Sequence, residues 1–121
     1  MIKLTEAEWQ VLGALWESPG ATLGDVVTAL APARKWQRNT VHTYLTRMEG
    51  KGLVKIDRTA EPHRYAAAVT REECARAERR SLLDKVYGGA AGDLIAAFLK
   101  ESAITPEERD RLRSLLDDME V

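Results

Sequence analysis

The sequence predicts a mainly α-helical fold that contains one small β-hairpin. Apolar residues recur at helical spacing in six separate segments, and three of these segments follow a Thr-x-x-Glu pattern that is typical of a helix start. Only residues 53–66 alternate apolar and polar side chains on both sides of a turn. Three helices are therefore expected before the hairpin and three after it.

The first two helices are predicted from their caps and their apolar faces. The Thr5 hydroxyl can accept a hydrogen bond from the Glu8 amide, while Glu8 reaches back to Thr5. The helix that follows ends at Ser18-Pro19-Gly20. Thr22 begins a short second helix, which Pro32 ends. The residues expected to face inward are Trp9, Leu12, Leu15, Trp16, Leu23, Val26, Val27 and Leu30.

Residues 36–50 predict a third helix with two contrasting faces. Val41, Leu45 and Met48 recur at i, i+4 and i+7 and form one apolar stripe. The opposite face carries hydrogen-bonding side chains, and the only carboxylate, Glu49, lies at the far end. Such a face suits contact with DNA phosphates and base edges, whereas an ordinary solvated face usually mixes both signs of charge. The expected DNA-binding residues are Arg38, Asn39, Thr40, His42, Thr43, Thr46 and Arg47.

A β-hairpin follows the third helix directly. Gly50 and Gly52 are expected to end the helix in the left-handed conformation. Residues 53–58 and 63–66 then form two strands, joined by a turn at residues 59–62. Three helices followed by a hairpin form a winged helix-turn-helix, in which the hairpin is the wing. Further DNA contacts are expected from Lys51, Arg58, His63 and Arg64.

The charge distribution supports a DNA-binding surface in this region. The net charge of the whole chain is only −1, which by itself does not indicate a polyanionic partner. Residues 34–65, however, contain eight Lys and Arg against three acidic residues. A local basic patch inside a nearly neutral chain is typical of a surface that binds phosphate groups.

The chain after the hairpin predicts three further helices. Thr70 and Thr105 each begin a capping box, and Gly88-Gly89 separates a long charged helix ending near Tyr87 from a shorter one. About fifty residues lie near the lower limit for an independent core, so we expect their apolar stripes to pack against a second copy. The expected dimerisation residues are Leu82, Val86, Leu94, Ile95, Phe98, Leu99, Leu112, Leu115 and Leu116. The predicted domains are a winged-helix DNA-binding domain, residues 1–69, and a helical dimerisation region, residues 70–121.

The sequence contains no recognisable catalytic or metal-binding constellation. His42 and His63 are the only histidines, and neither has a second ligand three or four residues away. Cys74 is the only cysteine, and its position on an apolar helix face favours burial over a nucleophilic role. We therefore expect no enzyme, no metal and no cofactor. The lack of a signal peptide and of an apolar run of about 18 residues predicts a cytoplasmic protein without membrane insertion.

Three segments, in this order, carry a family resemblance. They are Leu4-Thr5-Glu6-Ala7-Glu8-Trp9 with Leu15-Trp16, then Asn39-Thr40-Val41-His42-Thr43-Tyr44-Leu45-Thr46-Arg47-Met48, and finally Lys85-Val86-Tyr87-Gly88-Gly89 with the apolar residues 94–99. Together they resemble the BlaI/MecI/CopY family of bacterial transcriptional regulators, the penicillinase repressors. The resemblance implies a homodimeric repressor that binds a dyad-symmetric operator in double-stranded DNA, with the third helix in the major groove.

The resemblance also implies a route of release from DNA. In the best-known members, a membrane sensor that detects β-lactam triggers cleavage of the repressor in its C-terminal half, which weakens dimerisation. The matching bond in this chain joins Ala97 and Phe98, and well-studied members have asparagine before that phenylalanine. A sensor-linked protease is therefore one expected partner, and a different signal after β-lactam or cell-envelope stress is the other option. The paired Cys-x-Cys motifs of the copper-responsive branch do not occur in this sequence.

One competing interpretation comes from a different class of function. Winged-helix modules also serve in protein–protein assembly, without sequence-specific DNA binding. Such modules generally lose the one-sided basic face that this sequence retains at residues 38–47. The sequence therefore favours a DNA-binding transcriptional repressor over an assembly module.

Overall fold

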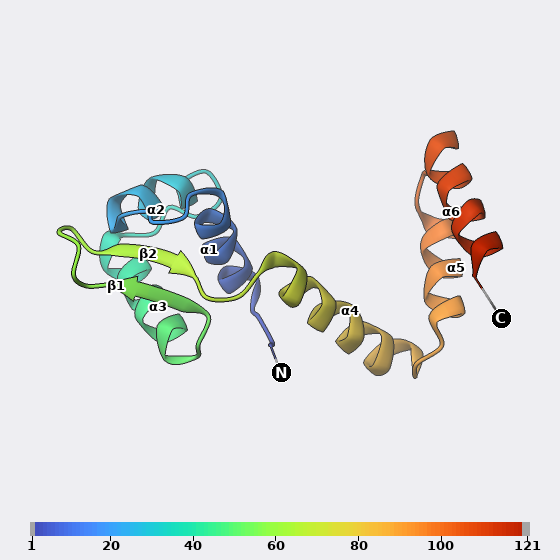
Figure 1. The fold of residues 1–121 in the computed structure, drawn as a ribbon, viewed down its shortest axis with the longest axis horizontal. Helices are drawn as coiled ribbons and strands as arrows, with labels where there is room; N and C mark the ends of the chain where they lie inside the picture. The colour runs from blue at the N-terminus through green and yellow to red at the C-terminus, as the bar shows by residue number, and fades with distance from the viewer. Residues whose placement is uncertain (1, 120–121) are drawn as a thin grey trace. The chain divides into compact units, whose positions relative to one another are not determined.

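The computed structural model describes residues 2–119, and within them it contains six helices and one two-stranded antiparallel sheet (Figure 1). The predicted fold class, mainly α with a small β-hairpin, is confirmed. Before the hairpin lie α1 (Glu6–Glu17), α2 (Leu23–Leu30) and α3 (Arg38–Gly50). The hairpin consists of β1 (Val54–Asp57) and β2 (Arg64–Ala67). After it come α4 (Arg71–Tyr87), α5 (Ala91–Glu101) and α6 (Pro106–Asp118).

Threonine caps fix where several helices begin. At α1, the Thr5 hydroxyl accepts a hydrogen bond from the Glu8 amide, and the Glu8 carboxylate accepts one from the Thr5 amide, as predicted. The same reciprocal pair begins α6. Thr22, predicted to begin the second helix, forms another such pair with Asp25 at α2. These bonds satisfy backbone amides that the first turn of a helix leaves free.

The core of the winged helix lies between the first three helices and the hairpin. Val41, Leu45 and Met48, the apolar stripe predicted for α3, are completely buried. Burying a large aliphatic side chain stabilises a fold by about 1.5–3 kcal/mol, so this stripe sets the rotation of α3 about its axis. The polar face of α3 must therefore point away from the core. The stripe packs in one cluster with Val11, Leu12, Leu15, Ala21, Val26, Leu30, Leu53, Val54, Tyr65 and Cys74.

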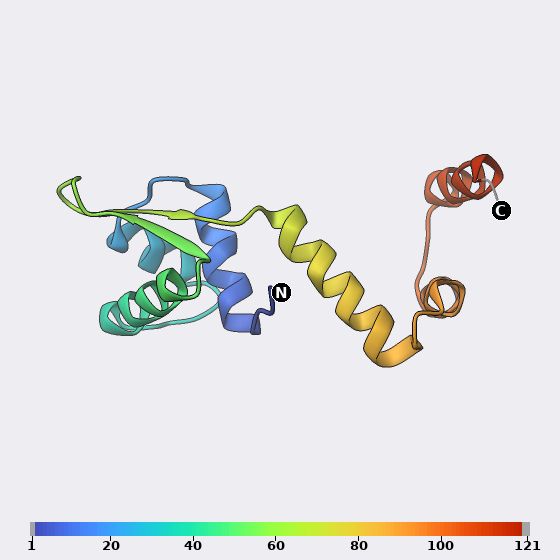
Figure 2. The same ribbon diagram turned by 60° about the horizontal axis from the view of Figure 1, so that its bottom comes forward.

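The hairpin is also joined to the segment between α1 and α2. Its register pairs Val54 with Ala67 and Asp57 with Arg64. Tyr65 of β2 donates its amide to the Ala21 carbonyl, and Tyr65 in turn accepts a hydrogen bond from the Gly20 amide. Figures 1 and 2 show that the closed end of the hairpin extends beyond α2 and α3. The hairpin therefore forms a wing beside α3.

The junction of α3 and β1 differs from the prediction in one detail. Gly52 has a φ of +78°, the left-handed conformation expected of a glycine that ends a helix. Gly50, predicted to share that conformation, is instead the last residue of α3 and is not among the glycines with positive φ. The Leu53 amide donates to the Met48 carbonyl across this turn. One left-handed residue is thus enough to reverse the chain, and the helix continues through Gly50.

The chain divides into two compact units, one up to Arg79 and one from Arg80 onward. The division falls within α4, later than the boundary expected at residues 69 and 70. The first turns of α4 belong with the winged helix, because Cys74 is buried in its core. The Trp16 Nε1 group also donates to the Val69 carbonyl at 2.9 Å, immediately before α4. None of the helices in the described part of the chain has the length and hydropathy needed to cross a membrane.

Candidate nucleic-acid interface

The outer face of α3 forms one continuous polar surface. All seven side chains predicted to bind DNA from this helix are exposed, from Arg38 to Arg47. The buried stripe on the opposite side of the helix holds them outward. The first turn of α3 contains no acidic residue. The structure therefore brings the predicted residues of this helix together on a surface that can approach an anionic polymer.

Two threonines on this face use their hydroxyl protons within the helix. Thr43 Oγ1 donates to the Asn39 carbonyl at 2.9 Å, and Thr46 Oγ1 donates to the His42 carbonyl at 3.0 Å. Each hydroxyl retains its acceptor capacity, and each side chain also carries a methyl group. Donors toward a ligand must come from the other residues of this face, which are Arg38, Asn39, Thr40, His42 and Arg47.

The start of α3 is supported by an aromatic stack. The N-cap residue, Gln37, makes no side-chain hydrogen bond to the helix. Instead, the rings of Trp36 and Tyr44 stack with centroids 4.6 Å apart and an interplanar angle of 9°. The Arg34 guanidinium lies 5.0 Å from the Trp36 ring centre, and its Nε donates to Gln10 of α1. These contacts join the connector before α3 to the rest of the winged helix.

The two wing arginines predicted to bind DNA are both anchored within the protein. Arg58 donates from both terminal nitrogens to the Glu49 carboxylate, at 2.6 and 2.8 Å. This bidentate pair lowers the pKa of Glu49 and joins the wing to the end of α3. Arg64 donates to the Gly20 carbonyl at 3.1 Å. Both arginines therefore help to fix the position of the wing relative to the helices.

Lys51, predicted as a DNA contact, is paired with the start of α1. Its Nζ donates to the Glu8 carboxylate at 2.8 Å, although the two residues are 43 positions apart in the sequence. The Glu8 side chain is only 4% exposed. Burial raises the pKa of Glu8, but the hydrogen bonds from Lys51 and Thr5 outweigh this effect, so the pKa is lowered overall. Lys51 therefore has a structural partner that the sequence pattern did not reveal.

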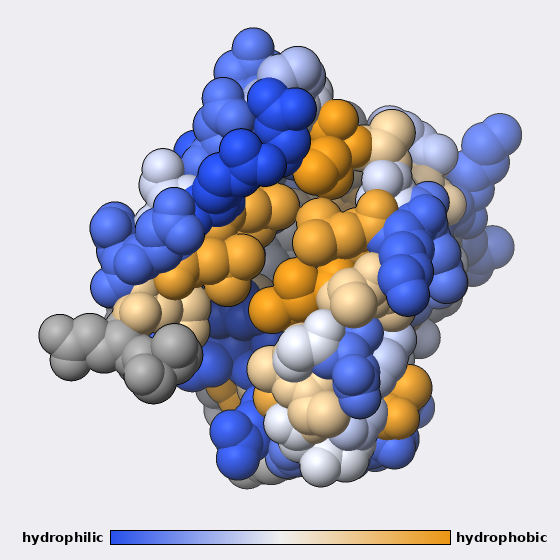
Figure 3. Space-filling model, turned by 90° about the vertical axis from the view of Figure 1, so that its right-hand side faces the viewer, coloured by the Kyte–Doolittle hydropathy of each residue, from blue (hydrophilic) through white to orange (hydrophobic). Residues whose placement is uncertain are grey.

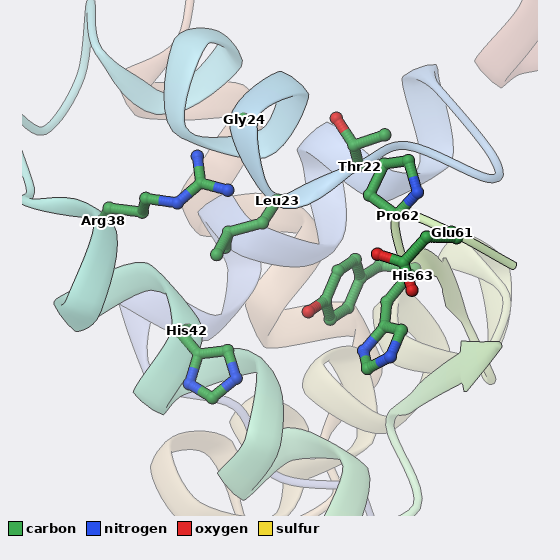
Figure 4. A pocket seen from close by; sticks show the side chains of 9 residues that line it. Thr22, Leu23, Gly24, Arg38, His42, Glu61, Pro62 and His63 are labelled. Carbon is green, nitrogen blue, oxygen red and sulfur yellow. The ribbon is translucent and has the colours of Figure 1, made fainter. Parts of the chain in front are cut away.

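A pocket of about 370 Å³ lies between the wing, α2 and α3 (Figure 4). Figure 4 shows Arg38 and His42 on the α3 side and Glu61, Pro62 and His63 on the wing side. The structure thus places the two histidines, which were predicted independently, in the lining of one pocket. Glu61 was not predicted, because an acidic turn residue gives no sequence signal for a DNA interface. The complete lining is Thr22, Leu23, Gly24, Arg38, His42, Glu61, Pro62, His63 and Tyr65.

The described residues contain no cluster of metal-ligating side chains, and their one cysteine is buried. Within residues 2–119, no three His, Cys, Asp or Glu side chains are grouped so that they could hold a metal ion. Cys74 is 1% exposed, as its position on an apolar helix face predicted. Burial raises the pKa of its thiol, and the charge of Glu73 adds to the effect. The thiol is therefore inaccessible and held in its less reactive form.

An outward polar helix beside a wing is the arrangement typical of winged-helix transcription regulators. A family model described as the penicillinase repressor matches residues 4–118. The chain belongs to the penicillinase repressor family, which confirms the resemblance found in its sequence. It is accordingly a transcriptional repressor, and this class of protein is not a class of enzymes.

Relatives of known name are distant but match over almost their full length. The methicillin resistance regulatory protein MecI of Mammaliicoccus sciuri is 23% identical over 115 residues, covering 95% of this chain and 94% of that protein. The penicillinase repressor of Staphylococcus aureus is 22% identical over 118 residues, with coverage of 98% and 94%. Among solved structures, a MepR mutant of S. aureus has 19% identity and a TM-score of 0.49, covering 96% of this chain and 77% of that one.

Proposed function

We propose that this repressor acts as a homodimer and binds a dyad-symmetric DNA operator. Helix α3 lies in the major groove in this arrangement, and the wing contacts the adjacent backbone or minor groove. The observation that carries the proposal is the outer face of α3, which is polar and basic and is held outward by Val41, Leu45 and Met48. The names of the relatives, among them two penicillinase repressors, support the same function.

The second unit supports the proposal of a dimer. No residue from 80 to 119 is buried in a single chain. Six of the nine predicted dimerisation residues are exposed, and three are half-buried. Figure 3 shows apolar side chains of α5 and α6 along an open hollow, flanked by hydrophilic residues. A hollow of about 230 Å³ has an apolar lining from Leu99 of α5, Ile104, and Leu112 and Leu116 of α6, and the charged residues Arg109, Arg113 and Asp117 complete it.

Such an apolar surface is costly to leave in water. Burying apolar area stabilises an association by about 25 cal/mol for each Å², and contiguous apolar patches on soluble proteins usually mark interfaces. A second copy of the same unit offers the same stripe, as a two-fold interface requires. The two-fold axis would also pair two α3 helices with two operator half-sites, so that dimerisation and DNA recognition reinforce each other.

Sequence-selective DNA binding by a verified dimer tests the proposal. Sedimentation establishes the oligomeric state, and selection from genomic fragments followed by a gel shift identifies the operator. Arg47→Ala should weaken operator binding and reduce the slope of log K against log salt by about one. Arg76→Ala, on the exposed surface of α4, is the matched control and should leave both unchanged. A dimer that selects no DNA sequence would favour the alternative function, protein–protein assembly.

Release from DNA is proposed to follow disruption of α5. Cleavage between Ala97 and Phe98, by a protease linked to a membrane sensor, is the first route. Phe98 is 55% exposed, and the N-cap residue Ala90 makes no side-chain bond to the helix, so the first turn of α5 lacks this support. Mass spectrometry of the protein from cells treated with a β-lactam should detect a fragment ending at Ala97. An intact chain during full induction of its target genes would instead indicate a different signal.

A further inference from the structure

We propose that the pocket between the wing, α2 and α3 receives one phosphate group of the DNA backbone, and that His42 and His63 make this contact depend on pH. The inference rests on the proposed function, since it requires DNA to lie against this face.

The two histidines lie on different sides of this pocket. They are the only histidines in the sequence, and both line the same pocket. His42 comes from α3 and His63 from the wing, so they approach the pocket from different elements (Figure 4). Both residues are exposed. They are therefore accessible both to a ligand and to protons from the solvent.

Arg38 gives the lining of the pocket a permanent positive charge. One of its terminal guanidinium nitrogens would lie 3.6 Å from a Cβ atom placed on Gly24, so the group sits close against the first turn of α2. The α2 side of the lining, Thr22 to Gly24, carries no charge. An arginine that lines the same pocket as two imidazoles offers several donors to phosphate oxygens, which only accept hydrogen bonds.

The net charge around the pocket becomes positive when the histidines are protonated. Glu61 on the wing lines the pocket, and Asp57 lies close enough to His63 for that histidine to contribute to lowering the pKa of Asp57, after the larger hydrogen bonds from Thr59. Asp57 pairs with Arg64 in the hairpin register, so the charges of these two residues balance. When both imidazoles are neutral, the charges of Arg38 and Glu61 in the lining also balance. When both imidazoles are protonated, three cations of the lining face one carboxylate. The buried phenol of Tyr65 completes the set of ionisable groups in the lining.

This gain of positive charge dictates the direction of the pH effect. Histidine is the side chain that gains its charge just below physiological pH. A phosphate favours the protonated imidazoles, so DNA binding takes up protons. By linkage, the affinity for DNA rises as the pH falls through the range in which histidine titrates.

The experiment measures the affinity of the untagged dimer for a fluorescent duplex of mixed sequence, about 30 base pairs long. Contacts with the backbone do not depend on base sequence, so this probe tests the pocket without a known operator. At constant low salt, binding should be about tenfold tighter near pH 6 than near pH 8. His42→Gln and His63→Gln should each remove part of this difference, and the double variant should remove most of it.

Two further variants separate the histidine effect from general electrostatics. His63→Arg places a permanent charge on the wing side and should reduce the pH dependence while retaining tight binding near pH 8. Arg47→Ala should weaken binding equally at both pH values, because arginine stays charged throughout this range. A wild-type affinity that is independent of pH, or a double variant that keeps the full pH dependence, would overturn the inference.

Proton NMR distinguishes the DNA phosphate from free phosphate. The chain has only two histidines, so their ring signals form two separate sets. Both sets should shift when the duplex is added, and neither should shift with inorganic phosphate alone at the same ionic strength. Shifts produced by inorganic phosphate alone would identify a small-anion site, and the assignment to DNA would be wrong. Selective operator binding without any pH effect would overturn this inference but leave the proposed function in place.

Discussion

Lys51 joins the end of α3 to the start of α1 through a carboxylate that is almost completely buried. Replacement by methionine should lower the free energy of unfolding by about 1–2 kcal/mol at neutral pH, because Glu8 loses a charged partner. Urea unfolding followed by tryptophan fluorescence measures this effect, since Trp9, Trp16 and Trp36 all lie in the first unit. Lys55→Met, at an exposed position of β1, is the control and should change stability by less than about 0.5 kcal/mol.

The pH dependence of the Lys51→Met effect provides a second check. Lys51 helps to lower the pKa of Glu8 in the folded protein below its ordinary value of 4.5. The stability that the pair contributes is therefore fully present above pH 4.5 and is lost as the pH falls through the lowered pKa. The difference between wild type and Lys51→Met should shrink in that acidic range. If the stability difference were the same at all pH values, it would come from lost packing of the lysine side chain and not from the ion pair.

Glu61 is the acidic residue in the lining of the proposed phosphate pocket. Glu61→Gln keeps the size of the side chain and removes its charge, so the affinity for a duplex should rise by about three- to fivefold. Fluorescence anisotropy with the mixed-sequence duplex measures the change. Glu78→Gln, on the exposed surface of α4, is the matched control for net charge. An equal gain from both variants would indicate a general effect of charge rather than a local one.

At the scale of elements, the two glycines at the junction of α3 and β1 adopt different backbone conformations, left-handed at Gly52 and helical at Gly50. A Cβ atom would meet no other atom within 4 Å at either position, so sterics with neighbours do not distinguish them. Gly52, at a φ of +78°, should lose about 1–2 kcal/mol of stability on replacement by alanine. Gly50 ends α3 in a helical conformation, and Gly50→Ala should be neutral or stabilising by up to about 1 kcal/mol.

The same pair of variants tests whether the junction positions the wing. Gly52→Ala should also weaken duplex binding, since strain there displaces β1 relative to α3. Gly50→Ala should leave duplex binding within about twofold of wild type. Urea unfolding gives the stabilities, and anisotropy gives the affinities. Equal effects at the two positions would mean that α3 ends earlier than the structure has it.

Elements defined by local pattern were predicted well from the sequence. The apolar stripe of α3, the capping box at Thr5 and the hairpin turn all depend on residues close together in the chain. The ion pair of Lys51 with Glu8 was not predicted, because spacing along a helix does not indicate which distant side chain it meets. The burial of Cys74 with the first unit is similar, since only tertiary packing extends that unit into α4.

The candidate DNA-binding surface shows the same limit, because contacts between distant residues do not follow from local sequence. The exposed residues of α3 follow from its helical period once the buried face is known. The ion pair between Arg58 and Glu49 joins two separate elements, and the sequence does not indicate it. From the sequence, the Arg58 side chain is therefore expected to be free to contact DNA. The pocket that unites His42 and His63 requires the angle between the wing and α3, which no local pattern contains. The two histidines were thus predicted individually from the sequence, but their common pocket was not.

At the scale of the whole molecule, the two units differ in how far they can bury their own apolar residues. Among the described residues, every buried one lies at or before Cys74, and none lies between 80 and 119. The winged helix therefore has a core of its own. The second unit needs a surface from elsewhere, and the proposed dimer provides it from an identical chain. A substitution in the proposed dimer interface should consequently lower operator affinity without changing the stability of the first unit.

The variant Leu115→Asp tests whether the dimer can be disrupted without affecting the core of the winged helix. Leu115 of α6 is 60% exposed in a single chain, and a charge there cannot enter an apolar dimer interface without a large desolvation cost. Sedimentation should show monomers, and operator affinity should fall by about a hundredfold or more, because the two α3 helices no longer bind as one unit. The urea transition reported by the tryptophans should not change. Ser114→Asp adds the same charge at the neighbouring exposed position and should retain the dimer. A Leu115→Asp protein that remains dimeric and binds the operator normally would place the interface away from α6.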